Sequence, residues 1–163
     1  MAKTKLSLQT LQDLDWSIRC SLTKIRPDYV PKTVYTDKTA NGLTKCIVHW
    51  INLNGYQAER ISTTGRYIDN SKVVTDVLGN RKKIGTGKYI KGSGTNGSAD
   101  ISATIKGRSI KIEVKIGKDR QSEAQIEYQK MIEKAGGIYF IAKDFDEFIE
   151  FYKRIIENKE ATY

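Results

Sequence analysis

Apolar side chains recur at helical intervals in the first third of the chain. One such run ends at Pro27 and Pro31, and its apolar positions are Leu8, Leu11, Leu14 or Asp15, Ile18, Leu22 and Ile25. A second run predicts a helix over about 39–54, with Leu43, Ile47, Trp50, Ile51 and Leu53 on its apolar side. Gly55 follows as a C-terminal glycine cap. The chain therefore begins with two amphipathic helices.

The second half of the chain alternates between strand and helix patterns. A strand is expected at 56–62, and two more at 99–105 and 109–116 flank a turn at 106–108. Ser122 and Gln125 form a capping box that starts a helix, and Gly136-Gly137 ends it. The continuous apolar run 138–142 is typical of a strand buried inside a sheet. Asp144 and Glu147 open a last helix whose inward residues are Phe145, Phe148, Phe151 or Tyr152, and Ile155.

This order of elements predicts an α/β or α+β layer fold, with helices packed on a central sheet. The 163 residues suit one compact domain. Within it, residues 1–36 form an N-terminal helical extension and residues 37–158 form the core.

The segment 70–95 differs from the rest because glycines divide it into short pieces and its charge is strongly positive. Six cations against the single acid Asp76 give +5, and the cations are Lys72, Arg81, Lys82, Lys83, Lys88 and Lys91. We interpret it as a basic β-rich insertion that contacts nucleic-acid phosphates; a solvated surface hairpin is the alternative. Arg60 and Arg66 are further candidates for phosphate contact, and Tyr67 and Tyr89 for stacking on bases.

Charge and composition narrow the classes of function. The chain has 28 Lys and Arg against 19 Asp and Glu, a net charge of +9, which favours a polyanionic partner such as nucleic acid. Charge that only maintains solubility is the alternative. Two cysteines without a CxxC pattern argue against a zinc site or disulfide framework, and a single histidine argues against a Ser-His or Cys-His pair. With no apolar stretch of signal-peptide or membrane length, we expect no membrane partner and a cytoplasmic protein.

Two carboxylates and an amine converge on the predicted hairpin. Lys111, Glu113 and Lys115 share one face of their strand, and counting about a turn centred on Gly107 places Asp100 opposite Val114. Carboxylates in this arrangement suit Mg²⁺, which Mn²⁺ can replace, and the Val114 carbonyl is a natural further ligand. Lys115 would orient the attacking water of a phosphodiester hydrolysis. A cross-strand ion pair on a solvated face is the alternative.

An ordered series of motifs surrounds these residues: Gly94-Thr95-Asn96-Gly97-Ser98-Ala99-Asp100, then Glu113-Val114-Lys115, then Ser122-Glu123-Ala124-Gln125, then Ala135-Gly136-Gly137. The series, over residues 40 to 150, resembles the PD-(D/E)XK nuclease superfamily and specifically its VRR-NUC group of virus-type replication and repair nucleases. The resemblance implies a restriction-endonuclease-like core: a central mixed β-sheet flanked by helices, here with an extra N-terminal helix and the basic insertion. It also implies that Asp100 and Glu113 bind metal, that Lys115 is the catalytic lysine, and that Gln125 lies beside the active centre.

The chain departs from the family pattern in two places. Members carry a metal-binding Glu in the first core helix, whereas Thr39, Ala40 and Asn41 occupy that place here, and Asp37 is the nearest acid. Ala99 replaces the Pro of the superfamily's name.

The resemblance favours a Mg²⁺-dependent DNA endonuclease acting on structured or branched DNA in a phage or mobile-element setting. One active site per chain predicts a homodimer for cutting two strands. Two alternatives stay open: an inactive nucleic-acid-binding protein that retains the fold, and an assembly protein whose insertion contacts acidic partners.

Overall fold

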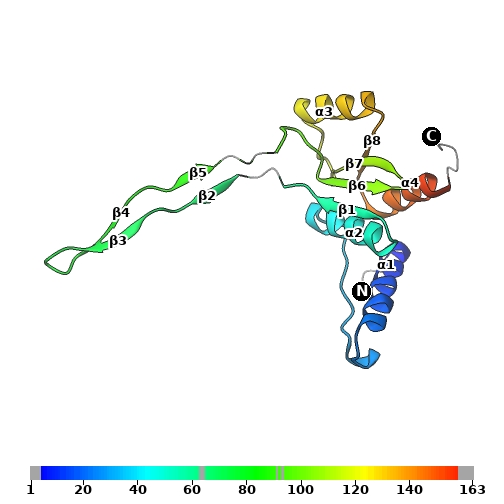
Figure 1. Ribbon diagram of the computed structural model, residues 1–163, viewed down its shortest axis with the longest axis horizontal. Helices are drawn as coiled ribbons and strands as arrows, with labels where there is room; N and C mark the ends of the chain where they lie inside the picture. The colour runs from blue at the N-terminus through cyan, green and yellow to red at the C-terminus, as the bar shows by residue number, and fades with distance from the viewer. Residues whose placement is uncertain (1–4, 63–64, 91, 93, 158–163) are drawn as a thin grey trace.

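The computed structural model describes residues 5–62, 65–90, 92 and 94–157 (Figure 1). Its helices are α1 (Leu6–Leu22), the short 3-10 helix η1 (Pro27–Tyr29), α2 (Ala40–Leu53), α3 (Glu123–Lys134) and α4 (Phe145–Glu157). Its strands are β1 (Gln57–Arg60), β2 (Arg66–Ile68), β3 (Lys72–Thr75), β4 (Arg81–Ile84), β5 (Lys88–Ile90), β6 (Ile101–Ile105), β7 (Arg108–Val114) and β8 (Ile138–Ala142). The protein is an α/β fold with a central sheet and two small hairpin sheets, as the order of patterns predicted at the level of fold class.

The central sheet has the strand order β1-β6-β7-β8. β1 and β6 pair antiparallel, as do β6 and β7, whereas β8 runs parallel to β7 after the chain crosses over through α3. β8 is therefore an edge strand, and the expectation that 138–142 lies inside the sheet is wrong. Its apolar run has another cause: α3 and α4 both contact β8, so both of its faces are covered although its outer edge is not paired.

Helices cover the two faces of the sheet unequally. α1, α2 and α4 gather on one face, and α3 lies alone on the other (Figure 1). The hydrophobic core occupies the first face, where Ile101, Ile110 and Ile112 of the sheet meet Ile47 of α2 and Phe148 of α4. None of these five side chains is exposed to solvent. α3 contains no buried residue, so the face of the sheet that it covers is free to hold polar groups.

The helix ends follow the expected capping chemistry. The Thr39 hydroxyl accepts a hydrogen bond from the Gly42 N–H at the start of α2, and Gly55 takes a positive φ of 81° after its end. In α4 all five predicted inward residues are buried: Phe145, Phe148, Phe151, Tyr152 and Ile155. α1 is shorter than its apolar pattern, because Thr23 is extended; Leu22 and Ile25 are consequently exposed.

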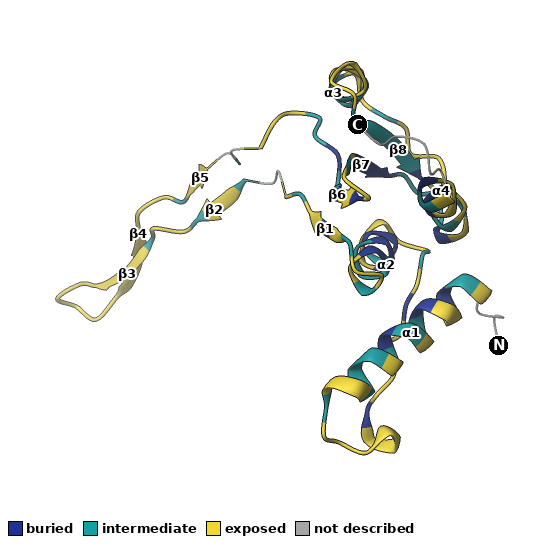
Figure 2. Ribbon diagram, turned by 45° about the vertical axis from the view of Figure 1, so that its right-hand side comes forward, coloured by how far each residue is buried: buried dark blue, intermediate teal, exposed yellow. Residues whose placement is uncertain are grey.

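The glycine-rich basic segment forms a long two-stranded arm that projects from the body (Figure 1). β2 pairs with β5 near the body, and β3 pairs with β4 farther out. No residue from 65 to 90 is buried, so the arm has no core of its own (Figure 2). At about 3.3 Å per residue, the ten residues from Arg66 to Thr75 span roughly 30 Å. The predicted insertion at 70–95 is thus β-rich, as expected, but begins several residues earlier.

Candidate metal centre

The β6–β7 hairpin sets which residues face one another at the candidate site. Ile105 pairs with Arg108, so the turn consists of Lys106 and Gly107 alone, both with positive φ (48° and 73°). Two-residue hairpin turns require such φ values. The expected three-residue turn is therefore wrong, and the register moves by one position. Ile101 pairs with Ile112. One residue further along this register, Asp100 lies opposite Glu113, and not opposite Val114 as counting about Gly107 predicted.

Asp100 is held by two strands just before β6 begins. Its carbonyl accepts a hydrogen bond from the Ile61 N–H at the end of β1 (2.7 Å), and its side-chain Oδ2 accepts one from the Val114 N–H (2.9 Å). Within a strand the N–H and C=O of one residue point toward the same neighbour, so the Val114 carbonyl lies on the Asp100 side of β7. The role of this backbone oxygen as a further ligand stays a prediction.

Glu113 is the most deeply buried acid of the site, with 2% of its surface exposed. Its Oε1 accepts a hydrogen bond from the Gln125 amide and forms an ion pair with Lys115 Nζ at 3.2 Å. Its Oε2 is buried and has no hydrogen-bond partner among the described residues. Burial, followed by the negative charge of Asp100, raises the pKa of the Glu113 carboxyl above its ordinary value of 4.5. A buried carboxylate oxygen without a partner is costly unless a cation or donor fills the place beside it.

Lys115 and Gln125 both contact Oε1 of Glu113. Lys115 Nζ also contacts Asp119 Oδ2 at 3.5 Å, so its ammonium lies between two carboxylates. Gln125 serves both roles that its sequence position allowed. Its Oε1 accepts the Ser122 N–H in the capping box of α3 (2.9 Å), while its Nε2 donates to Glu113. The start of α3 is thereby fixed to the carboxylate of the site.

The loop before Asp100 requires glycine at position 97. The φ of Gly97 is +75°, and a Cβ at this position would lie 2.3 Å from the Ala124 carbonyl oxygen in the first turn of α3. Only glycine allows the loop to pass so close to the helix. The loop that carries Asp100 and the helix that carries Gln125 are therefore packed directly against each other.

These residues fit a divalent cation with oxygen ligands. Asp100, Glu113 and the Val114 carbonyl offer hard oxygens, and Mg²⁺ is commonly held by one or two carboxylates while its other positions take water or substrate phosphate. Among the described residues no group of three or more His, Cys, Asp or Glu side chains is arranged to hold a metal ion. Asp37 does not supply a third carboxylate, because it is paired with Lys5 Nζ (2.9 Å) and accepts the Phe145 N–H at the start of α4 (3.4 Å).

The predicted phosphate-binding residues lie along the arm and at its base. Arg60 ends β1 opposite Ile101, one residue from Asp100, and is exposed. The others stand on the four arm strands and are also exposed: Arg66, Lys72, Arg81, Lys82, Lys83 and Lys88. Lys83 pairs with Asp69 at 3.1 Å. Lys91 lies outside the described residues.

The pattern analysis missed Tyr139 and Asp119. Tyr139 lies on β8 in register with Lys111, and burial together with the charge of Glu113 raises the pKa of its phenol to about 12. Its buried hydroxyl lies close enough to Glu113 for each group to shift the pKa of the other, although neither this hydroxyl nor Glu113 Oε2 makes a hydrogen bond of regular geometry among the described residues. Only the parallel pairing of β7 with β8 reveals this neighbour, since an apolar run gives no indication of register. Asp119 follows Lys115 by four residues, a spacing that has meaning only once the 117–121 turn is known.

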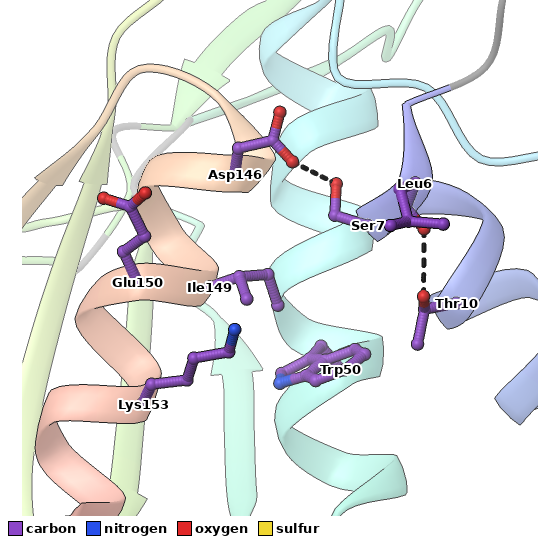
Figure 3. A pocket seen from close by; sticks show the side chains of 8 residues that line it. All are labelled: Leu6, Ser7, Thr10, Trp50, Asp146, Ile149, Glu150 and Lys153. Atoms are coloured by element: carbon purple, nitrogen blue, oxygen red, sulfur yellow. Dashed lines mark hydrogen bonds between the residues drawn. The ribbon is translucent and has the colours of Figure 1, made fainter.

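A separate cavity of about 380 Å³ lies on the other side of the molecule, where α1, α2 and α4 meet (Figure 3). Trp50 and Ile149 form its apolar floor, and Ser7 bonds to Asp146 across its rim. It contains none of the predicted site residues, and we regard it as the seam between the N-terminal helix and the body.

Comparison with known proteins adds no relative: no protein-family model matches the chain, and no curated protein is significantly similar to it. Among the described residues, no helix is both long and apolar enough to cross a membrane.

Proposed function

We propose that the protein is a Mg²⁺-dependent DNA endonuclease, built on a restriction-endonuclease-like core. The observation that carries the proposal is the Glu113 carboxylate, which is almost fully buried beside Asp100 with its Oε2 unpaired. Burial and the charge of a second carboxylate both raise the pKa of Glu113, and a divalent cation beside the two acids would offset both effects. The ordered motifs around these residues, which resemble those of VRR-NUC nucleases, support the same conclusion.

Each residue has a distinct role in this proposal. Asp100 and Glu113 hold the cation, and Gln125 keeps the Glu113 carboxylate in one orientation through its amide hydrogen bond. When bound, the cation polarises the scissile phosphate and lowers the pKa of a water molecule. Lys115 supplies a positive charge 3.2 Å from Glu113, where it orients the attacking water or stabilises negative charge that develops on the phosphate.

The basic arm beside the site supports DNA as the substrate. The arm leaves the sheet after β1 and returns just before Asp100, so its base lies beside the proposed cleavage centre and its cations extend outward from there. A structured or branched substrate is supported by the resemblance alone, and action as a homodimer by the need to cut two strands with one active site per chain. Light scattering that shows a strict monomer at micromolar concentration would remove the dimer.

The test is a cleavage assay on duplex, single-stranded and four-way-junction DNA, with Mg²⁺, Mn²⁺ or EDTA. We expect metal-dependent cleavage that Glu113→Gln and Asp100→Asn abolish. Lys115→Ala is expected to slow cleavage by about 100-fold or more. Lys111→Ala is the matched control, because Lys111 lies four residues before Lys115, on β7, and donates to Ser102 instead of contacting the carboxylates. Equal activity of the two lysine variants would contradict the role of Lys115, and cleavage in EDTA would contradict metal dependence.

A second candidate is a nucleic-acid-binding protein without catalysis. The observation that favours it is the small number of carboxylates at the site, since Asp37 is engaged elsewhere. It predicts salt-sensitive DNA binding with no cleavage in either metal. The same assay, with binding followed in parallel by gel shift, separates the two candidates.

A further inference from the structure

The tip of the arm presents two apolar side chains directly to solvent. Val77 and Leu78 are 103% and 83% exposed, more than any other large apolar residues of the arm. They stand where β3 turns into β4, at the point of the arm farthest from the body (Figure 1). Large apolar side chains at the end of a projecting ribbon indicate a contact with another molecule.

The turn that carries this pair is held in one shape by a single carboxylate. Asp76 Oδ1 accepts the N–H groups of Leu78 (2.9 Å) and Asn80 (2.8 Å), and the Asn80 side chain donates to Oδ2. Gly79 supplies the positive φ of 84° that closes the turn. The acid's charge is thus directed inward to the loop backbone, and the apolar pair is directed outward.

The stem of the arm is stiffened near its base by two tyrosines. Tyr67 and Tyr89 face each other across β2 and β5. Each ring covers the backbone of a glycine on the opposite strand: a Cβ on Gly87 would meet the Tyr67 ring, and one on Gly65 would meet the Tyr89 ring. Aromatic rings over cross-strand glycines stabilise a ribbon that lacks a core.

The charge of the arm identifies what its tip meets. Residues 66–90 carry six Lys and Arg and two Asp, a net charge of +4. Both acids are engaged within the arm: Asp69 pairs with Lys83 and accepts the Ser71 N–H, and Asp76 accepts the N–H groups of its turn. Among the described residues, no ion pair engages the remaining five cations, Arg66, Lys72, Arg81, Lys82 and Lys88. The arm therefore offers a phosphate-binding stem and an apolar end.

We propose that the arm lies along duplex DNA and that Val77 and Leu78 insert between base pairs as a wedge, which kinks the duplex. Proteins that enter the minor groove with cations on a narrow element and an apolar residue at its end bend DNA by about 20–90°. The arm's length of roughly 30 Å is close to one helical turn of about 34–36 Å. The kink thus forms about one turn away from Asp100. The inference shares its partner with the proposed nuclease function but does not depend on cleavage.

The experiment uses the full chain in EDTA, where no metal-dependent cutting can occur, and a short duplex labelled at its ends for energy transfer. Wild type is expected to bring the two ends closer together, and a fluorescent base analogue within the site should report unstacking. In Val77→Thr/Leu78→Thr both signals are expected to be largely lost and affinity to fall about tenfold. Its salt dependence should match that of wild type, because no cation has been removed. The matched control is Val73→Thr/Val74→Thr, which removes two exposed apolar side chains from the stem and should bend DNA as wild type does.

A straight duplex in the wild-type complex, or equal bending by the tip and stem variants, would overturn the wedge. So would two other results. In the first, wild type binds anionic vesicles and the tip variant does not, which assigns the tip to a membrane surface. In the second, wild type is a dimer and the tip variant a monomer, which assigns the tip to another copy of the chain. Bending without cleavage in Mg²⁺ would support the wedge while removing the nuclease, so the two proposals fail separately.

Discussion

The body and the arm of this protein obtain their order from different sources. In the body, side chains such as Ile112 and Phe148 are fully buried between the sheet and the helices. In the arm no residue is buried, and order comes from strand pairing, the tyrosine–glycine contacts and the Asp76 turn. A two-stranded ribbon alone is only marginally stable in water. The body therefore has a hydrophobic core of its own, whereas the arm is held only by its strand pairing, its aromatic contacts and its turn.

The strongest test of this comparison is to replace residues 66–90 with a short Gly-Ser linker. Since the arm's five unpaired cations are lost, the slope of log affinity against log salt should become shallower by about 4, at about 0.9 per phosphate contact. DNA affinity should fall by orders of magnitude, as measured by fluorescence anisotropy over a salt series. Thermal unfolding should stay close to that of wild type; a large loss of stability would show that the body depends on the arm.

Truncating one apolar side chain in each region should give very different costs. Phe148→Ala removes a ring from the centre of the core and should lower the free energy of unfolding by about 3–5 kcal/mol. Val73→Ala, on the exposed arm, should change it by no more than about 0.5 kcal/mol. Urea denaturation of both variants gives the comparison, and similar costs would mean that the arm unfolds together with the body.

Two glycines with similar backbone angles separate strain from crowding. Gly97 and Gly79 have φ values of +75° and +84°, but a Cβ would clash with the Ala124 carbonyl only at Gly97. Gly97→Ala should lower the free energy of unfolding by about 1–3 kcal/mol and weaken cation binding, because it displaces the start of α3 and with it Gln125. Gly79→Ala carries the same φ strain on the arm and should leave both quantities nearly unchanged, as thermal melts with and without Mg²⁺ would show.

The smallest expected effect is a dependence of the free energy of unfolding on pH. Since the pKa of Glu113 is raised in the folded protein, its burial favours the protonated form. In EDTA this group stabilises the fold at pH values below its unfolded pKa, and that contribution is lost as the pH rises through its folded pKa. Relative to Glu113→Gln, wild type should therefore lose stability as the pH rises above 4.5.

Mg²⁺ should reverse this trend, because protons compete with the cation for the carboxylate. The increase in melting temperature that Mg²⁺ gives wild type should grow as the pH rises, and Glu113→Gln should show little increase at any pH. A Mg²⁺ effect of the same size in the two proteins would place the cation away from Glu113.

Features set by nearby residues were predictable from the sequence. The Ser122–Gln125 capping box, the Gly55 helix end and the inward face of α4 all depend on spacings within two helical turns. The convergence of Asp100 with Glu113 was also predicted, since it needs only a hairpin between them.

Features set by pairing between distant segments were not predictable. Counting about Gly107 gave the wrong register because it assumed one residue too many in the turn. The apolar run 138–142 indicated coverage by helices but not that β8 lies at the edge. Tyr139 reaches the site only through the parallel pairing of β7 and β8, and the reach of the arm depends on which of its short strands pair.

The hydrogen bond from the Ile61 N–H to the Asp100 carbonyl has an evolutionary consequence. It joins the residue after which the chain enters the arm to the residue at which the chain returns, so the body is connected across the base of the arm. A lineage can therefore lengthen, shorten or exchange this segment by a single insertion or deletion, while Asp100 and Glu113 keep their places. Selection on the length and sequence of the arm can then proceed separately from selection on Asp100 and Glu113.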